Sequence, residues 1–380
     1  MRILHTADWH LGRLFHGTHL TNDQSHLLDQ FIDLLADQKP DVIVLSGDVY
    51  DRAYPPVEAV ELLDETLARI AIDHNIPMLI IAGNHDNPSR LEFGSRLMTD
   101  RGIYLFGRLT SCDTPIVLQD ADGPVTFYLA PYCEPAEVRA HLQDDAAVCF
   151  DSAMRSLVGR HQVNGRSVLL SHSFVHGGSV SDSERPLSIG GADTVSADHF
   201  LPFSYVALGH LHQPQSFNGG RVRYSGSLMK YSFNEAAQRK SVSIVEIDAA
   251  GEIQTEEFQL TPRRDMRVIR GTLEELLQRP DDYGPRDDYL MATLLDEGAV
   301  YDAMGRLRDV YPNLMHLERA AQLEGDGEIR RASDIVGKSD LDLFNDFMQA
   351  MTSSEMTPEQ TEVFVEVAEE IRREEREGTS

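Results

Sequence analysis

The sequence is poor in cysteine and in positive charge, and it contains no long apolar run. Its 380 residues include only three cysteines, which lie far apart, so neither a CxxC metal site nor a disulfide framework is expected. No apolar stretch approaches the roughly 20 residues needed to cross a bilayer. The first residues are polar and lead directly into an expected strand, so no secretory signal is expected. We therefore expect a reduced, cytoplasmic protein without a membrane segment.

Basic residues are greatly outnumbered. The chain has 34 Lys and Arg against 62 Asp and Glu, a formal net charge of -28. Because nucleic-acid binders usually gain affinity from Lys and Arg, this charge argues against a protein that holds DNA unaided. The excess is uneven, however, since residues 341–380 contain eleven acids and only three arginines. Exposed charges are screened beyond about 8 Å at physiological salt, so an acidic tail leaves a distant phosphate site possible.

Short β-branched runs alternate with helical stretches in the first two-thirds of the chain. Residues 23–35 and 57–72 have apolar side chains at helical spacing and lie between the first three expected strands. The alternation predicts an α/β fold with a mostly parallel or mixed sheet covered by helices. The expected strands are residues 2–7, 42–46, 78–82, 126–130, 167–171, 205–208, 221–224 and 241–247.

The pattern changes near residue 262, which we take as the end of the first domain, 1–262. Residues 263–323 predict a small α+β domain, followed by a charged, glycine-containing linker at 324–340. Residues 341–380 predict two amphipathic helices, the second beginning with a capping box at Thr357-Pro358-Glu359-Gln360. In the α+β domain we expect strands at 266–270, 289–294 and 314–318 and helices at 273–278 and 300–310.

Side chains that can bind metal follow five of the expected strands. They occur in Asp8-Trp9-His10, Gly47-Asp48, Gly83-Asn84-His85-Asp86, Ser171-His172 and Gly209-His210-Leu211-His212. Ligands of open α/β sheets bind outside the carboxyl ends of the strands, so these side chains are expected at one edge. The spacing of two in Asp8/His10 and His210/His212 would point each pair to one side of an extended backbone. The preceding glycines would permit sharp turns and close approach.

Each of these motifs has a plainer interpretation by itself. Asp-x-His is commonly a surface pair, Gly-Asp a turn, Gly-Asn-His-Asp a helix cap, and a lone His172 a structural histidine. Their coincidence at five strand ends favours a metal centre instead. Carboxylate, amide and imidazole donors without thiolate suit Mn²⁺ or Fe²⁺ better than a structural zinc ion. Two such ions ~3.5–4 Å apart can clamp the attacking and leaving oxygens of a phosphoester displacement.

The five motifs, in this order across residues 1–215, resemble the calcineurin-like metallophosphoesterase superfamily. More narrowly, residues 5–12, 207–212, 224–227 and 232–233 resemble bacterial double-strand-break-repair nucleases that work with a coiled-coil ATPase. The resemblance implies a sandwich of mixed sheets flanked by helices, a small α+β domain that caps the DNA, and a C-terminal helical pair. The sequence resembles the protein phosphatases of the superfamily less well. Asp51-Arg52 matches part of their motif, but Ala53 and Asp86 stand where that group has glycine and glutamate.

The resemblance also implies two metal sites, occupied by Mn²⁺, that share Asp48. One would be formed by Asp8, His10, Asp48 and His212, and the other by Asp48, Asn84, His172 and His210. His85 would not bind metal but would stabilise the transition state or protonate the leaving oxygen. The implied activity is exonuclease cleavage of double-stranded DNA ends and endonuclease cleavage of hairpins. The implied assembly is a heterotetramer, in which a homodimer of this chain binds the ATPase.

Further residues are assigned by their setting. Ser225, Gly226 and Ser227 offer hydroxyls and amides of the kind that position phosphates, so they are predicted DNA contacts. The apolar faces of the tail helices are predicted to dock on the ATPase, unless they pack on their own domain. These faces include Phe344, Phe347, Met351, Phe364, Val367 and Ile371. Trp9, His5, His16 and His176 are interpreted as structural, and Asp86 as a residue that supports the ligands or caps a helix.

Two other functions remain open. A small-molecule phosphodiesterase or phosphatase could use the same pair of metals, but it would leave residues 266–380 without a task. A non-catalytic scaffold of the same fold should have lost metal ligands, whereas all seven are present.

Overall fold

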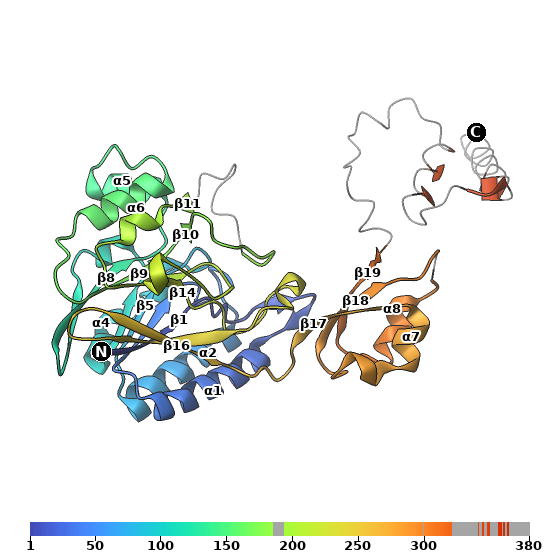
Figure 1. The fold of residues 1–380 in the computed structure, drawn as a ribbon, viewed down its shortest axis with the longest axis horizontal. Helices are drawn as coiled ribbons and strands as arrows, with labels where there is room; N and C mark the ends of the chain where they lie inside the picture. Colours follow the sequence, from blue (N-terminus) through green and yellow to red (C-terminus); the bar gives the residue numbers. More distant parts are fainter. Residues whose placement is uncertain are drawn as a thin grey trace, which may run out of the picture. The chain divides into compact units, whose positions relative to one another are not determined.

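The computed structural model describes residues 1–184, 194–298 and 300–320, with residues 341, 344–345, 348–349, 356–358, 360–361 and 363–364 of the tail. The chain forms two compact units, Met1–Asp265 and Met266–Ser380 (Figure 1). The division falls three residues after the domain boundary expected from the sequence. No described helix is long and apolar enough to cross a membrane.

Unit 1 contains a first six-stranded sheet with the order β16-β15-β1-β4-β5-β6. The four strands β1, β4, β5 and β6 run parallel to one another, whereas β15 and β16 join the sheet antiparallel. Helix α1 (Thr21–Gln38) connects β1 to β4, and α2 (Val57–Ala68), extended by a π-helical turn at Arg69–His74, connects β4 to β5. The strands are β1 (Arg2–Thr6), β4 (Val42–Ser46), β5 (Met78–Ile81), β6 (Ile103–Phe106), β15 (Ser241–Ile247) and β16 (Ile253–Gln259).

A second six-stranded sheet has the order β13-β14-β12-β9-β8-β7. Its four central strands are parallel, and β7 and β13 are antiparallel edges. The strands are β7 (Ile116–Asp120), β8 (Gly123–Ala130), β9 (Ser167–His172), β12 (Tyr205–Gly209), β13 (Gln215–Phe217) and β14 (Val222–Tyr224). The unit also has the short strands β2 (Leu14–Phe15), β3 (Thr18–His19), β10 (Phe174–Val175) and β11 (Thr194–Val195), and helices α3 (Pro88–Leu91), α4 (Ser95–Met98), α5 (Pro135–Leu142) and α6 (Phe150–Gly159).

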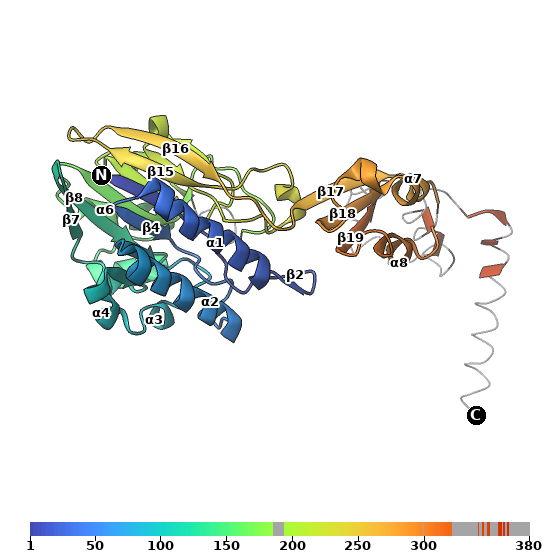
Figure 2. The ribbon, with the colours of Figure 1, turned by 90° about the horizontal axis from the view of Figure 1, so that it is seen from below.

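The two sheets face each other across one apolar core. Val44 and Leu79 of the first sheet belong to the same buried cluster as Phe127, Leu170 and Ala207 of the second. Helices α1 and α2 cover the outer side of the first sheet, and α5 and α6 lie over the second (Figures 1 and 2). The predicted α/β sandwich of mixed sheets is confirmed. The expectation of a single sheet edge is wrong, because β1, β4 and β5 belong to one sheet and β9 and β12 to the other.

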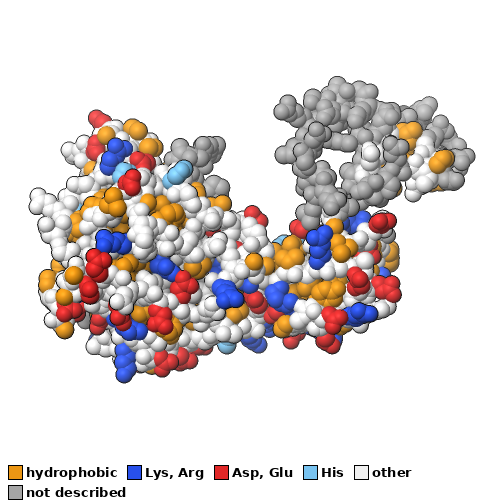
Figure 3. All heavy atoms as spheres, viewed as in Figure 1, with side chains coloured by type: hydrophobic (Ala, Val, Ile, Leu, Met, Phe, Trp, Pro, Cys, Tyr) orange, Lys and Arg blue, Asp and Glu red, His pale blue; other side chains and the backbone are white. Residues whose placement is uncertain are grey.

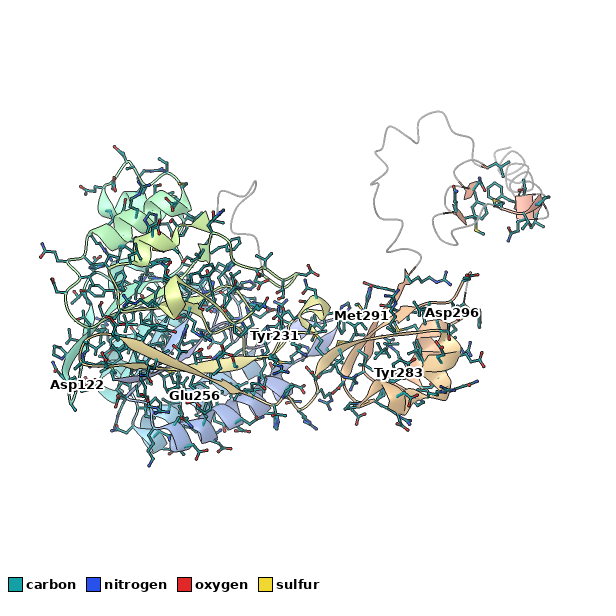
Figure 4. The ribbon with its side chains drawn as sticks, viewed as in Figure 1. Asp122, Tyr231, Glu256, Tyr283, Met291 and Asp296 are labelled. Atoms are coloured by element: carbon teal, nitrogen blue, oxygen red, sulfur yellow. The ribbon has the colours of Figure 1, made fainter. Side chains whose placement is uncertain are left out.

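Unit 2 has a three-stranded parallel sheet in the order β17-β18-β19. The strands are β17 (Met266–Gly271), β18 (Tyr289–Leu294) and β19 (Leu314–Arg319), with helices α7 (Leu273–Gln278) and α8 (Ala303–Arg308). A separate buried cluster joins sheet and helices through Ile269, Leu276, Leu290 and Leu307. Met291 lies in the central strand, and Tyr283 follows α7 (Figure 4). The second helix is shorter than expected, since Asp302 caps it by accepting from the Gly305 amide at 3.3 Å.

The described tail residues include the predicted capping box. The Thr357 amide donates to Gln360 Oε1 at 2.9 Å, and the Gln360 amide donates to Thr357 Oγ1 at 3.3 Å, which confirms this helix start. The rings of Phe344 and Phe364 stack with their centroids 4.3 Å apart. The other predicted partner contacts lie outside the described residues; they are Phe347, Met351, Val367 and Ile371. The predicted linker at 324–340 also lies outside them.

Candidate active site

Loops from both sheets of unit 1 bring the predicted metal-binding residues together. Ligand atoms of Asp8, His10 and Asp48, which follow β1 and β4, lie within 4.8 Å of one another. His172, at the end of β9, places Nδ1 3.9 Å from Asp8 Oδ1. The His210 ring, just beyond β12, lies 5.5 Å from the His172 ring between centroids. Residues that are more than 200 positions apart in the chain thus share one buried site.

Asp48 lies between the two halves of this site. Its Oδ2 atom is 3.6 Å from His10 Nε2 and also 3.6 Å from His172 Nε2. Its Oδ1 atom accepts from the His85 amide at 2.9 Å. A single carboxylate oxygen therefore faces imidazole nitrogens on both sides.

Beside Asp48, two electron-pair donors face each other without a proton between them. His172 Nδ1 lies 2.9 Å from the Ser46 carbonyl oxygen, which can only accept, so Nδ1 carries the proton. Nε2 then presents its lone pair to Asn84 Oδ1, also at 2.9 Å. Burial lowers the pKa of His172, which favours this neutral form. Two acceptors at this distance repel each other unless a cation lies nearby.

A second pair of facing nitrogens lies on the other side of Asp48. His10 Nε2 and His212 Nε2 are 3.0 Å apart. His10 Nδ1 is buried and has no hydrogen-bond partner among the described residues; Asp51 Oδ1 is 3.7 Å away. Burial lowers the pKa of His10 well below its usual range, as do the neighbouring His85 and His212. The neutral donors, with no thiolate among them, fit a divalent cation of the Mn²⁺ or Fe²⁺ class.

The electrostatics of the site also fit bound cations. Burial, followed by the charge of Asp48, raises the pKa of Asp8 well above its usual range. Burial lowers the pKa of His210 to about 3. Divalent ions would offset the two buried carboxylates while the imidazoles stay neutral.

His85 is held differently from the other histidines. Its Nδ1 atom donates to the Asp51 carbonyl oxygen at 2.7 Å, and its Nε2 atom lies 4.0 Å from Asp48 Oδ2. Its ring is 4.6 Å from the His10 ring, centroid to centroid. The imidazole is thus fixed by the backbone on one side and presents one nitrogen to the site.

The backbone at the site is left-handed rather than extended. Asp8, His10 and Asp48 have φ of 53°, 46° and 48°, and His210 has φ of 107°. The expectation that extended backbone aligns Asp8 with His10 and His210 with His212 is therefore wrong, since β1 and β12 end before these residues. Such conformations cost roughly 1–3 kcal/mol each and persist where the surroundings hold them. One such restraint is the His210 amide, which donates to both oxygens of Asp8 at 3.0 and 3.2 Å.

The predicted need for glycine is confirmed at all three positions. Gly47 has φ of 90°, and a Cβ there would lie 2.3 Å from His172 Nδ1. At Gly83, a Cβ would lie 2.1 Å from Asp48 Oδ1. At Gly209, a Cβ would lie 1.9 Å from the Ser46 carbonyl oxygen. Any larger residue would displace a site residue.

Asp86 supports the ligands, as predicted, by joining the loops after β4 and β5. Its carboxylate accepts from the amides of Val49, Tyr50 and Gly83 at 3.1, 2.9 and 2.9 Å. Burial, followed by the charge of Asp48, raises the pKa of Asp86 to about 7. Fixing these two loops fixes both Asp48 and Asn84.

Trp9 and His5 are structural, as predicted. Trp9 is fully buried, donates from Nε1 to Thr6 Oγ1 at 2.9 Å and packs edge-on against Phe31. His5 lies between the sheets, with Nδ1 2.7 Å from the Tyr205 hydroxyl. The two residues stabilise the sandwich beneath the site.

Two supporting residues are not predicted by the sequence. Gln24 of α1 donates to the carbonyl oxygens of Trp9 and His10 at 3.1 and 2.8 Å. Tyr231 (Figure 4) donates its hydroxyl to the Trp9 carbonyl and contacts the His10 ring. Neither belongs to a local motif, because both reach the ligand loop only through tertiary structure.

The predicted DNA contacts at Ser225, Gly226 and Ser227 are placed inside the protein. Both serines are fully buried, and the Ser227 hydroxyl donates to the Met229 carbonyl at 2.8 Å. The Ser227 amide donates to the His212 carbonyl at 3.2 Å. This burial argues against hydroxyl contacts to DNA, and the segment instead shapes the loop around His212.

Comparisons with known proteins identify the family of the chain. A family model described as calcineurin-like phosphoesterase matches residues 1–214, and one described as type 5 capsule protein repressor C-terminal domain matches residues 262–352. The chain is 36% identical over 324 residues to the SbcD subunit of the nuclease SbcCD from Staphylococcus epidermidis, a match that covers 83% of this chain and 85% of that protein.

Two solved structures are also similar. The protein TT1561 of Thermus thermophilus has a TM-score of 0.39 and 14% identity, over 67% of this chain and 98% of that one. A dimetal phosphatase from Danio rerio has a TM-score of 0.40 and 13% identity, over 68% of this chain and 99% of that one.

The chain therefore belongs to the calcineurin-like phosphoesterases, metal-dependent hydrolases of phosphoester bonds. Within that class it is a member of the SbcD family of nucleases.

Proposed function

We propose that this chain is the nuclease subunit of an SbcCD-type complex, in which it cleaves double-stranded DNA ends and hairpins with an SbcC-type ATPase partner. Support comes from its 36% identity to the SbcD subunit of a known SbcCD nuclease along 83% of the chain. The proposal includes a homodimer within a heterotetramer and a cytoplasmic location beside the nucleoid. It also gives residues 266–380 a task in DNA capping and partner binding.

The proposed centre would hold two Mn²⁺ ions, with Asp48 as a ligand common to both sites. Asp8, His10 and His212 would complete one site, and Asn84, His172 and His210 the other. The observation that carries this proposal is the position of Asp48 Oδ2, 3.6 Å from both His10 Nε2 and His172 Nε2. Each nitrogen faces a further ligand atom at 2.9–3.0 Å, as expected where a cation binds.

When bound, divalent ions supply Lewis-acid stabilisation of phosphate charge and lower the pKa of water. The protein contributes orientation and a proton. The Asp51 carbonyl holds His85 Nδ1 at 2.7 Å, so Nε2 is the nitrogen that can give a proton to the leaving oxygen. Asp86 keeps the loops of Asp48 and Asn84 in register during turnover.

The test is a substrate panel with purified full-length protein. Linear duplex DNA, hairpin DNA and a cyclic nucleotide are compared at equal phosphodiester concentration, with Mn²⁺ or EDTA, and with and without the ATPase partner and ATP. We expect Mn²⁺-dependent cleavage of linear duplex by the chain alone, and a wider range of DNA substrates with the partner.

A cyclic nucleotide hydrolysed faster than DNA under every condition would favour the small-molecule phosphodiesterase. Absence of Mn²⁺-dependent cleavage of all three substrates, in a protein that folds normally, would favour the scaffold.

A further inference from the structure

A buried acid outside the proposed metal centre lies directly behind His212. Glu235 is fully buried, and its Oε1 atom is 3.4 Å from His212 Nδ1. Oε1 also accepts from the hydroxyls of Ser183 and Ser232, the latter at 3.0 Å. Oε2 pairs with Lys240 Nζ at 2.6 Å. Burial of this ion pair costs desolvation free energy, so its position beside a proposed ligand requires an explanation.

The network determines which nitrogen of His212 carries the proton. Ser183 Oγ lies 2.7 Å from His212 Nδ1 and donates its own hydrogen to Glu235. Ser183 Oγ is therefore the acceptor toward His212, so Nδ1 holds the proton and Nε2 presents its lone pair. That lone pair faces His10 Nε2 at 3.0 Å.

The main chain of His212 is fixed by the same network. Its amide donates to Glu184 Oε1 at 2.7 Å, and its carbonyl accepts from Lys240 Nζ at 2.7 Å. The Ser181 hydroxyl donates to Glu184 Oε2 at 2.6 Å and lies 3.1 Å from Glu235 Oε1. Residues 181–184 are thus tied to His212 from both sides.

The two halves of the centre differ in this respect. His172 Nδ1 donates to a neutral backbone carbonyl, that of Ser46, at 2.9 Å. His212 Nδ1 instead contacts the Ser183 hydroxyl and, behind it, the Glu235 carboxylate. A carboxylate behind a metal-binding imidazole fixes the ring and raises its basicity, and its loss typically weakens metal binding about 10- to 100-fold.

We propose that Glu235, acting through Ser183, is a positioning residue that orients His212 and strengthens metal binding at the half of the centre containing His10 and His212. The other half, built on His172, does not depend on it. The inference rests on the proposed dimetal function, since it takes His212 as a ligand. Metal affinity at that half of the centre would then depend on the hydrogen bonds that residues 181–184 make to His212 and Glu235.

The test is a Mn²⁺ titration of the full-length apoprotein, followed by calorimetry. In Glu235→Gln we expect one of two Mn²⁺ equilibria to weaken about 10- to 100-fold and the other to change less than about threefold. The matched control is Glu92→Gln, because Glu92 is also a buried acid, bonded to Gly107, Arg108 and Ser111 in another part of the unit. It should leave both equilibria unchanged.

Ser183→Ala keeps the Glu235–Lys240 pair and carries the test if Glu235→Gln does not fold. It should weaken the same single equilibrium. Unchanged binding in both folded variants would overturn the inference, and so would equal weakening of both equilibria, which indicates a merely structural role. A wild-type protein that binds no Mn²⁺ would instead overturn the proposed function.

Discussion

His85 and Asp48 have different tasks although they are in direct contact. Asp48 offers one oxygen to imidazoles on two sides, whereas His85 has one nitrogen committed to the Asp51 carbonyl and one open to the site. Loss of Asp48 should therefore disturb metal binding, and loss of His85 should disturb only the chemical step.

The first prediction concerns His85→Asn. We expect DNA cleavage to fall about 10²- to 10⁴-fold, because the variant lacks the proposed proton donor. Bound metal, measured by elemental analysis, should stay near two ions per chain. The control is His26→Asn, an exposed histidine of α1. Cleavage by His85→Asn at the wild-type rate would show that this histidine has no catalytic role.

At the residue scale, the sequence predicts which side chains form the proposed metal centre better than it predicts the residues that support them. Asp8, His10, Asp48 and His172 follow strands in short motifs and converge in the structure. Glu235 lies 23 positions from His212, and Gln24 lies 14 positions from His10. Such contacts exist only after folding. The left-handed turns are not predicted either, because a spacing of two is equally compatible with extended backbone.

Among elements, buried strands are the part that local pattern predicts well. The runs at β4 and β9 are apolar on both faces, as in sheets covered on both sides. The edge strand β16 has no fully buried residue and therefore no alternating apolar pattern. Assignment of β9 and β12 to a second sheet depends on which strands pair at long range, and β-branched runs carry no information about partners.

The second prediction concerns the core of unit 2. Leu290→Ala in β18 should lower the free energy of unfolding of this unit by about 2–5 kcal/mol, because Leu290 is fully buried in its own cluster. Denaturant unfolding followed by circular dichroism should show one destabilised transition. The control is Val268→Ala in the neighbouring strand β17, where the side chain is 40% exposed. An unshifted transition in Leu290→Ala would contradict the assigned core.

For the whole molecule, charge and domain organisation bear on how DNA is held. Unit 1 displays acidic and basic side chains interspersed on the face shown in Figure 3. With a net charge of -28, the chain has little electrostatic affinity of its own for a polyanion. A partner that contributes DNA affinity is consistent with this balance.

The third prediction concerns the tail. Deletion of residues 341–380 should abolish co-purification with the ATPase partner, because the apolar faces of the two tail helices are the proposed docking surface. Cleavage of linear duplex by the truncated chain alone should stay within about twofold of wild type. Undiminished co-purification would place the docking surface elsewhere. The variant Phe344→Asp keeps the full chain length, so loss of co-purification in this variant would show that the apolar face itself is needed.

The central claim, a dimetal centre that cleaves DNA and is bridged by Asp48, is tested most directly by Mn²⁺-dependent cleavage of linear duplex DNA in wild type and Asp48→Asn. In the proposed centre both sites would lose a charged ligand in the variant, so we predict cleavage at least about 100-fold slower and no cleavage by either protein in EDTA. Equal rates for the two proteins in Mn²⁺, or cleavage that persists in EDTA, would contradict the account.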